Sequence, residues 1–238
     1  MADTSERYAW KEIPGSSHDL LRRCIRELPT GLRLLDLGAA GGHLGRAVRD
    51  RCAFLAGVEP DPALPASARE GYDDWRATDA LAAGTWSEPF DVVVCADVLE
   101  HLPRPEELLL LIRGWLREGG TLFVSLPNVA NVTVRAALAA GRFPYADRGI
   151  LDRTHLRFYT RRTARELLTA SGFTPRSVAA TAMPYEIGLP FLAKAPWRGP
   201  VRAFASASAK VWPTLFGYQF VIEAEKRSVR TSEFGIRI

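Results

Sequence analysis

Residues 33–44, which read RLLDLGAAGGHL, decide the fold. A short apolar run ends in Asp36, and a turn rich in glycine and alanine leads from it into a helix-like pattern. A strand, a tight turn and a helix in this order let backbone N–H groups approach a ligand closely, because no large side chain stands in the way. A second apolar run, residues 54–58, ends in Glu59. In a βαβ unit that carboxylate accepts hydrogen bonds from both hydroxyls of a ribose, so we expect a nucleoside-containing cofactor.

The spacing of the glycines narrows the choice of cofactor. A dinucleotide fingerprint reads G-x-G-x-x-G, and counting from Gly38 its next two glycine positions hold Ala40 and His43. The order found is instead D-x-G-x-A-x-G, which ends at Gly42. An alanine is tolerated in the middle position if its φ is negative, and we expect a negative φ at Ala40. An ordinary strand–turn–helix is the alternative interpretation of this loop on its own.

Two further segments follow in a fixed order. Residues 90–102 read FDVVVCADVLEHL, and residues 116–125 read LREGGTLFVS. With the loop, they resemble the first motif, fourth strand and fifth strand of the class I S-adenosylmethionine (SAM)-dependent methyltransferases, whose usual loop is D/E-x-G-x-G-x-G. The resemblance spans roughly residues 17–182. It implies SAM as cofactor and an α/β fold, a doubly wound, mostly parallel seven-stranded sheet (the Rossmann-like methyltransferase fold) with an antiparallel last strand.

Composition supports a single α/β domain, because 238 residues with 47% hydrophobic content can bury one large core. The chain has no apolar run of about eighteen residues, so no membrane span is expected. The polar, acidic start is unlike a signal peptide, and three scattered cysteines without C-x-x-C spacing favour free thiols in a reducing compartment. We therefore expect a cytoplasmic protein. The net charge of +4 comes almost entirely from arginines that fit solvated helix faces, which argues against a nucleic-acid partner.

Hydrophobic periodicity predicts alternating strands and helices, as in a parallel doubly wound sheet. The expected strands are 32–37, 53–58, 75–78, 90–95, 120–125, 176–182 and 218–225. The expected helices are 16–28, 42–51, one from 66, 105–116, 129–140, and one that ends at Gly172. This last helix begins at Thr160 or Thr163, the latter forming a capping box with Glu166.

The sequence predicts four parts in the chain, as follows. Residues 1–30 form an N-terminal cap helix, and residues 31–182 form the SAM-binding core, which contains an acceptor loop at 142–159. Residues 183–214 are a lid or insertion rich in proline and aromatic residues, and residues 215–238 form the last strand and a tail. The insertion has three alternative roles, which are a buried cap, a homodimer surface and a peripheral contact with a membrane.

The resemblance assigns cofactor contacts to residues at strand ends and in the first loop. These are Asp36, Gly38, Ala40 and Gly42 in the loop, Glu59 on the ribose, Pro60, Asp79 and Ala80 near the adenine, Cys95 and Ala96 along the cofactor, and His18 over its methionine end. For Asp79 the alternative is a simple turn aspartate. For His18 it is a surface histidine that caps its own helix.

Residues 151–160, LDRTHLRFYT, resemble an element of bacterial methyltransferases encoded with sugar and polysaccharide genes. They also resemble, more distantly, the T-H-x-x-x-F element of the ubiquinone-biosynthesis O-methyltransferases. The implied acceptor is a hydroxyl on a sugar or small natural product. His155 is the candidate general base, because the ordinary histidine pKa lies near neutral pH, and Asp152 or Asn128 can orient it or bind substrate. Further candidates for substrate binding are Asn128, Asn131, Arg157 and Tyr145. The alternative for His155 is packing beneath a helix.

No metal site is predicted, because Asp97, His101, Asp152 and His155 show no recognisable ligand spacing. Two rival functions remain open. One is a SAM-binding accessory protein without turnover. The other is a nucleotide-cofactor oxidoreductase or epimerase, against which the failed dinucleotide fingerprint and the missing Tyr-x-x-x-Lys pair both argue.

Overall fold

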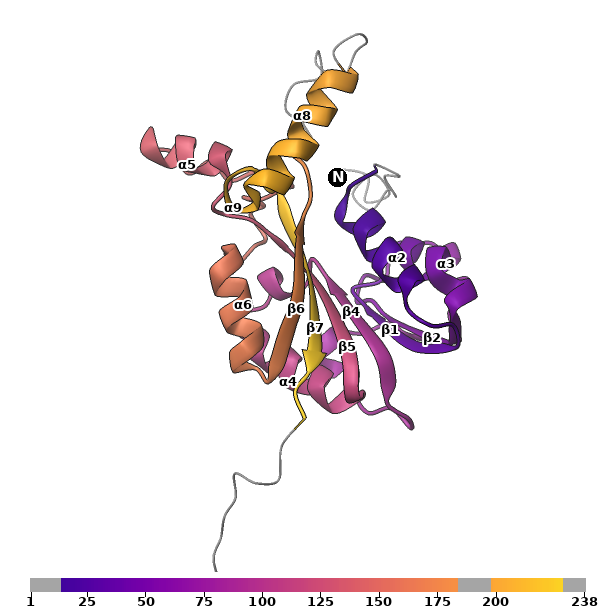
Figure 1. The fold of residues 1–238 in the computed structure, drawn as a ribbon. Coiled ribbons are helices and arrows are strands. Elements are labelled where there is room, and N and C mark those ends of the chain that lie inside the picture. The colour runs from indigo at the N-terminus through magenta and orange to yellow at the C-terminus, as the bar shows by residue number, and fades with distance from the viewer. Residues whose placement is uncertain (1–13, 184–197, 229–238) are drawn as a thin grey trace, which may run out of the picture.

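The computed structural model describes residues 14–183 and 198–228, which are built around a seven-stranded sheet (Figure 1). The strands are β1 Leu32–Leu37, β2 Cys52–Val58, β3 Asp74–Arg76, β4 Phe90–Ala96, β5 Leu116–Pro127, β6 Phe173–Ala180 and β7 Gln219–Lys226. Their order is β3-β2-β1-β4-β5-β7-β6. The pairs from β3 to β5 are parallel, and β7 is antiparallel to both of its neighbours. The prediction of a mostly parallel sheet with an antiparallel last strand is confirmed.

Both faces of the sheet are covered, which is why its central strands are almost continuously apolar. On one face, helices α2 (Ser17–Glu27) and α3 (His43–Val48) pack on one set of alternating side chains, including Leu34 and Val92. On the other face, α4 (Pro105–Trp115) and α6 (Arg161–Ala170) pack on the opposite set, including Leu35 and Val93. Neighbouring residues of a strand therefore serve two different cores.

Shorter elements complete the described residues. They are η1 Arg49–Arg51, η2 Ala66–Arg69, η3 Ala80–Ala82, η4 Leu99–His101, α5 Val132–Ala139, α8 Arg198–Val211 and α9 Pro213–Phe216. The expected helix at 42–51 is split between α3 and η1, and the helix expected from 66 is only a single 3-10 turn. Within residues 14–183 and 198–228, no helix combines the length and apolar character needed to cross a bilayer.

The predicted capping box of α6 is wrong. Thr160 is the N-cap, and its side chain accepts a hydrogen bond from the backbone N–H of Thr163. The hydroxyl of Thr163 in turn accepts one from the backbone N–H of Thr160 at 2.9 Å. Glu166 instead accepts a hydrogen bond from Arg162 at 2.7 Å, one turn away on an exposed face.

The predicted insertion lies between β6 and β7 and supplies α8 and α9 at the carboxyl edge of β1, β4 and β5 (Figure 1). Residues 184–197 of that insertion lie outside the described residues, as do residues 1–13 of the predicted cap and residues 229–238 of the tail. The N-terminal helix α2 reaches the same edge of the sheet. This edge therefore collects the loops that can form a site.

Candidate functional site

A cavity of about 750 Å³ opens at the carboxyl ends of β1, β2 and β4. The order in which strands are added to the sheet reverses at this place. The chain runs from β1 outward to β2 and β3 and then returns to β4 on the other side of β1. Ligands of open α/β sheets bind at such a switch point. The start of α2, the loop at residues 148–155 and one face of α8 complete the walls. The volume suits a small-molecule site.

Most of the predicted cofactor residues line this cavity. They are His18, Asp36, Gly38, Ala40, Glu59, Pro60, Asp79, Ala80 and Ala96. For His18 the capping alternative is wrong, because the N-cap of α2 is Ser16, whose side chain accepts from the N–H of Asp19. Asp79 does accept a hydrogen bond from the N–H of Leu81 at 2.8 Å, so it is a turn residue and a cavity residue together.

Glu59 is held at the cavity wall by the first loop. Its carboxylate accepts hydrogen bonds from the backbone N–H of Ala40 at 2.8 Å and of Asp61 at 2.9 Å. The side chain is 6% exposed, so these two bonds orient it almost completely. A carboxylate has about four lone-pair sites, so two further hydrogen bonds remain for ligand hydroxyls. Glu59 therefore fits the ribose of a nucleoside.

The backbone of Ala40 contradicts the expectation of a negative φ, since its φ is +47°. Gly38 and Gly42, on either side of it, have φ values of +69° and +67°. The left-handed conformation at all three positions turns the chain so that the N–H of Ala40 reaches Glu59. An L-residue in this region is strained by about 1–2 kcal/mol, so alanine here costs stability that glycine would not.

Gly38 must be glycine for a second reason, because an added Cβ would lie 2.6 Å from the Cγ2 of Val98. Two other predicted cofactor residues do not line the cavity. A Cβ on Gly42 would lie 2.0 Å from the carbonyl oxygen of Ala68, so that glycine serves the packing of η2. Cys95 is fully buried in the core, and burial raises the pKa of its thiol.

Asp36 lies at the base of the cavity and is almost fully buried. Burial raises its pKa to about 7. The hydroxyl of Tyr72, which donates to Asp36 at 2.7 Å, opposes this rise, whereas the negative charge of Glu59 adds to it. The Asp36 carboxyl group at the base of the cavity therefore changes from neutral to negatively charged near neutral pH.

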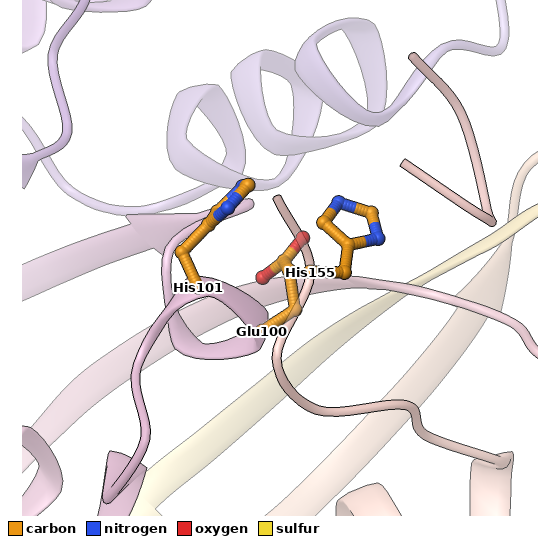
Figure 2. Close-up of side chains that lie close together, drawn as sticks. All are labelled: Glu100, His101 and His155. Carbon is orange, nitrogen blue, oxygen red and sulfur yellow. The ribbon is translucent and has the colours of Figure 1, made fainter. Parts of the chain in front are cut away.

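At the other end of the cavity, Glu100 and His101 from η4 meet His155 from the loop before α6 (Figure 2). Glu100 is 1% exposed, and neither of its carboxylate oxygens has a hydrogen-bond partner among the described residues. The two imidazole rings lie 4.8 Å apart between centroids. We call these three residues the Glu–His–His cluster.

Backbone hydrogen bonds hold the cluster together. The carbonyl oxygen of Glu100 accepts from the N–H of Leu156 at 2.8 Å and of Arg157 at 3.0 Å, which fastens the loop to η4. The Nδ1 of His155 lies 3.1 Å from the carbonyl oxygen of Ile150. Burial lowers the pKa of His155, so its neutral form is favoured.

The orienting role predicted for Asp152 toward His155 stays a prediction. Asp152 lines the cavity, but one of its oxygens accepts from both the N–H and the hydroxyl of Thr154, at 2.8 and 2.7 Å. The Nδ1 of the His155 ring faces the Ile150 carbonyl. Asn128 is fully buried, and its amide donates to the carbonyl of Gly217 at 2.8 Å.

The other predicted substrate residues also lie away from the cavity walls. Asn131 caps α5 and donates to the carbonyl of Gly217, as Asn128 does. Arg157 donates to the carbonyl of Pro103 at 3.0 Å. Tyr145 is 56% exposed and packs edge-on against Phe143. These side chains hold the loops in place around the site.

Sequence reasoning missed Glu100, and it grouped His101 with His155 only in a set of residues without recognisable metal-ligand spacing. The signal was present, because the segment LEH at residues 99–101 is separated by only two residues from a buried strand whose carboxyl end lies at the ligand edge. Arg148 and Arg202, which also line the cavity, were missed because they come from a loop and from the insertion.

Comparison with known proteins gives a family and relatives. A family model described as a methyltransferase domain matches residues 7–178. A ubiquinone biosynthesis O-methyltransferase from Azoarcus sp. (strain BH72) is 30% identical over 161 residues, which cover 60% of this chain and 68% of that protein. One from Pseudomonas entomophila (strain L48) is 34% identical over 105 residues, covering 41% of this chain and 45% of that protein. This chain therefore spans less than half the length of the second relative.

Solved structures share the fold. A SAM-dependent methyltransferase from Archaeoglobus fulgidus has a TM-score of 0.62 at 19% identity, with 94% of this chain and 98% of that chain covered. The magnesium protoporphyrin IX methyltransferase (ChlM) from Synechocystis PCC 6803 with bound SAH has a TM-score of 0.58 at 16% identity, with 88% and 82% covered. At these identities the similarity concerns the arrangement of the sheet and helices.

Proposed function

The chain belongs to the methyltransferase domain family, and we propose that it transfers a methyl group from SAM to a hydroxyl oxygen of a small acceptor such as a sugar or a natural product. One observation carries the proposal. A single cavity has a ribose-binding carboxylate, Glu59, at one end and the Glu–His–His cluster at the other. A cofactor that spans from Glu59 toward β4 presents its reactive end to that cluster.

When bound, SAM supplies a methyl group on a positively charged sulfur, which leaves as the neutral sulfur of S-adenosylhomocysteine (SAH). The acceptor hydroxyl loses its proton while its oxygen forms a bond to the methyl carbon and the carbon–sulfur bond breaks. Catalysis of such an in-line displacement consists largely of holding the two reactants in line. The chain's own task is therefore to position both partners and to accept or stabilise the departing proton.

Different residues of the cavity carry out the parts of this task. Glu59 directly follows β2, and Asp79 is the N-cap of η3. Both hold the nucleoside, because both carboxylates line the cavity. His18 at the start of α2 covers the opposite side. His155 presents a lone-pair nitrogen at the acceptor end, since its Nδ1 faces a carbonyl oxygen that can only accept, which leaves Nε2 with the lone pair.

The nature of the acceptor is supported by the size and polarity of the cavity. A volume of about 750 Å³ has to hold the cofactor and the acceptor together, which favours a small molecule. Its acceptor end carries the Glu–His–His cluster together with Asp97 and Arg148. Such groups suit a molecule with several hydroxyls. The O-methyltransferase names of the relatives agree with oxygen as the methylated atom.

A labelled-methyl assay tests the proposal. The full chain is incubated with SAM that carries a tritiated methyl group and with a fractionated small-molecule extract of the source organism. Labelled products are then identified by mass spectrometry. We expect label in a methyl ether, and none with the Glu59→Ala variant as control. Label in an N-methyl or C-methyl product, or no transfer by a chain that binds SAH, would contradict O-methylation.

A further inference from the structure

We propose that the Glu–His–His cluster binds one divalent transition-metal cation at the acceptor end of the cavity. Each of Glu100, His101 and His155 offers one ligand atom, and these atoms all lie within 4.8 Å of one another. Figure 2 shows the Glu100 carboxylate between the two imidazole rings. Two imidazoles and one carboxylate form a donor set that binds zinc and other first-row divalent ions.

The orientation of both rings supports this assignment. The Nδ1 of His101 lies 3.2 Å from the carbonyl oxygen of Thr154, and the Nδ1 of His155 lies 3.1 Å from that of Ile150. A carbonyl oxygen only accepts, so each Nδ1 carries the proton and each Nε2 carries the lone pair. Metal-ligating histidines usually donate their other ring N–H in this way, which fixes the tautomer and directs the ring.

The state of Glu100 is the second, independent observation. Its side chain is 1% exposed, and both carboxylate oxygens are without a hydrogen-bond partner among the described residues. A buried, unpaired carboxylate is costly, and pairing with a cation is one of the few ways to remove that cost. No arginine or lysine forms an ion pair with Glu100 within residues 14–183 and 198–228.

The geometry needs only a small adjustment. Ligand atoms about 2.1 Å from one tetrahedral ion lie about 3.4 Å from each other, so separations of up to 4.8 Å must shorten by up to about 1.4 Å. His101 is exposed and can make this movement, whereas Glu100 is held by the packing of η4. All three residues line the cavity, so a bound cation is accessible from it.

This proposal rests on the proposed function, because the further ligand of the metal is the acceptor hydroxyl of that reaction. With three ligands from the chain, an open position binds the acceptor hydroxyl. The cation lowers the pKa of that hydroxyl, and the proton leaves to water through the open cavity. His155 then acts as a ligand that positions the cation, and the general-base role predicted for it passes to the solvent. The prediction that no metal is bound is replaced by this proposal.

Metal titration tests the proposal without any methyl transfer. The full chain is treated with a chelator, dialysed, and titrated separately with Zn²⁺, Co²⁺, Mn²⁺ and Mg²⁺ by calorimetry, and the Co²⁺ complex is also followed by its visible absorption. We expect one transition-metal ion per chain. His101→Ala and Glu100→Gln should each weaken binding at least 100-fold. Folding of both is checked by circular dichroism, and His101→Ala is expected to fold because His101 is exposed.

A matched control comes from the same cavity. His43 lines its wall outside the cluster, so His43→Gln should leave the metal affinity within about twofold. No saturable binding, or binding that is unchanged in His101→Ala and Glu100→Gln, would overturn the metal site. SAH titrations on the same samples separate the two proposals. A chain that binds SAH but no metal refutes only the metal, and one that binds metal but never methylates a hydroxyl refutes only the proposed reaction.

Discussion

Replacing Gly38 by alanine tests how the first loop is built. The substitution forces an L-residue into φ +69° and places its Cβ 2.6 Å from the Cγ2 of Val98. The left-handed conformation costs about 1–2 kcal/mol and overpacking costs about 1–3 kcal/mol, while reduced freedom of the unfolded chain returns about 0.4–1 kcal/mol. We expect Gly38→Ala to lower the free energy of unfolding by about 1–5 kcal/mol, as measured by urea denaturation.

The chain offers a control that separates the two causes. Gly141 has a φ of +68°, but an added Cβ there would have no neighbour within 4 Å. Gly141→Ala should therefore show only the conformational cost, and the difference between the two variants measures the contact with Val98. Adding Val98→Ala to Gly38→Ala should recover most of that difference. Equal losses for Gly38→Ala and Gly141→Ala would refute the close approach of Val98.

Three further variants have defined outcomes. Ala40→Gly relieves a residue at φ +47°, so it should raise the free energy of unfolding by up to about 1.5 kcal/mol and leave the SAH affinity within about threefold; a clear loss of stability in thermal melts would contradict the strained turn. Because burial raises the pKa of Asp36 from 3.8 to about 7, wild-type stability should fall as the pH rises from about 4 to about 7, by at most about 4 kcal/mol. Asp36→Asn should remove this fall, since its amide oxygen still accepts from Tyr72. The free energy of unfolding is measured at pH 4, 6 and 8, and the same pH dependence in both proteins would contradict this prediction. His155→Ala should lower kcat by about 10²–10⁴-fold with an unchanged SAH affinity; full turnover per folded molecule with a lower Tm would assign His155 to packing against Phe158.

The core of the fold could be predicted because local sequence determines it. Strand β1 was predicted at 32–37 and is observed at Leu32–Leu37, since an apolar run ended by an acid and glycines leaves little freedom. The position of Glu59 at the end of β2 was predicted in the same way, because it ends the apolar run at residues 54–58. The N-cap of α6 was predicted only as Thr160 or Thr163, because both carry suitable hydroxyls and only the backbone path distinguishes them.

The rest depended on contacts that are distant in the sequence. Asn128 looks like a ligand residue after a strand, but its amide is used by the carbonyl of Gly217, 89 residues away. His101 and the loop that carries His155 meet through the carbonyl of Thr154, 53 residues away. The sign of φ at Ala40 follows from the contact of its N–H with Glu59. The predicted roles of the insertion as lid, homodimer surface or membrane contact stay predictions.

Calorimetric titration with SAH is the decisive measurement, because Glu59 is proposed to hold the ribose of SAM in the cavity. We predict one SAH per chain with an affinity in the micromolar range, about −8 kcal/mol, and no competition by NAD⁺. Glu59→Ala, measured well below its Tm, should weaken binding by about 1.5–3 kcal/mol through the loss of charge-assisted hydrogen bonds to the ribose. Tight binding of NAD⁺, or SAH binding that Glu59→Ala leaves unchanged, would contradict the account.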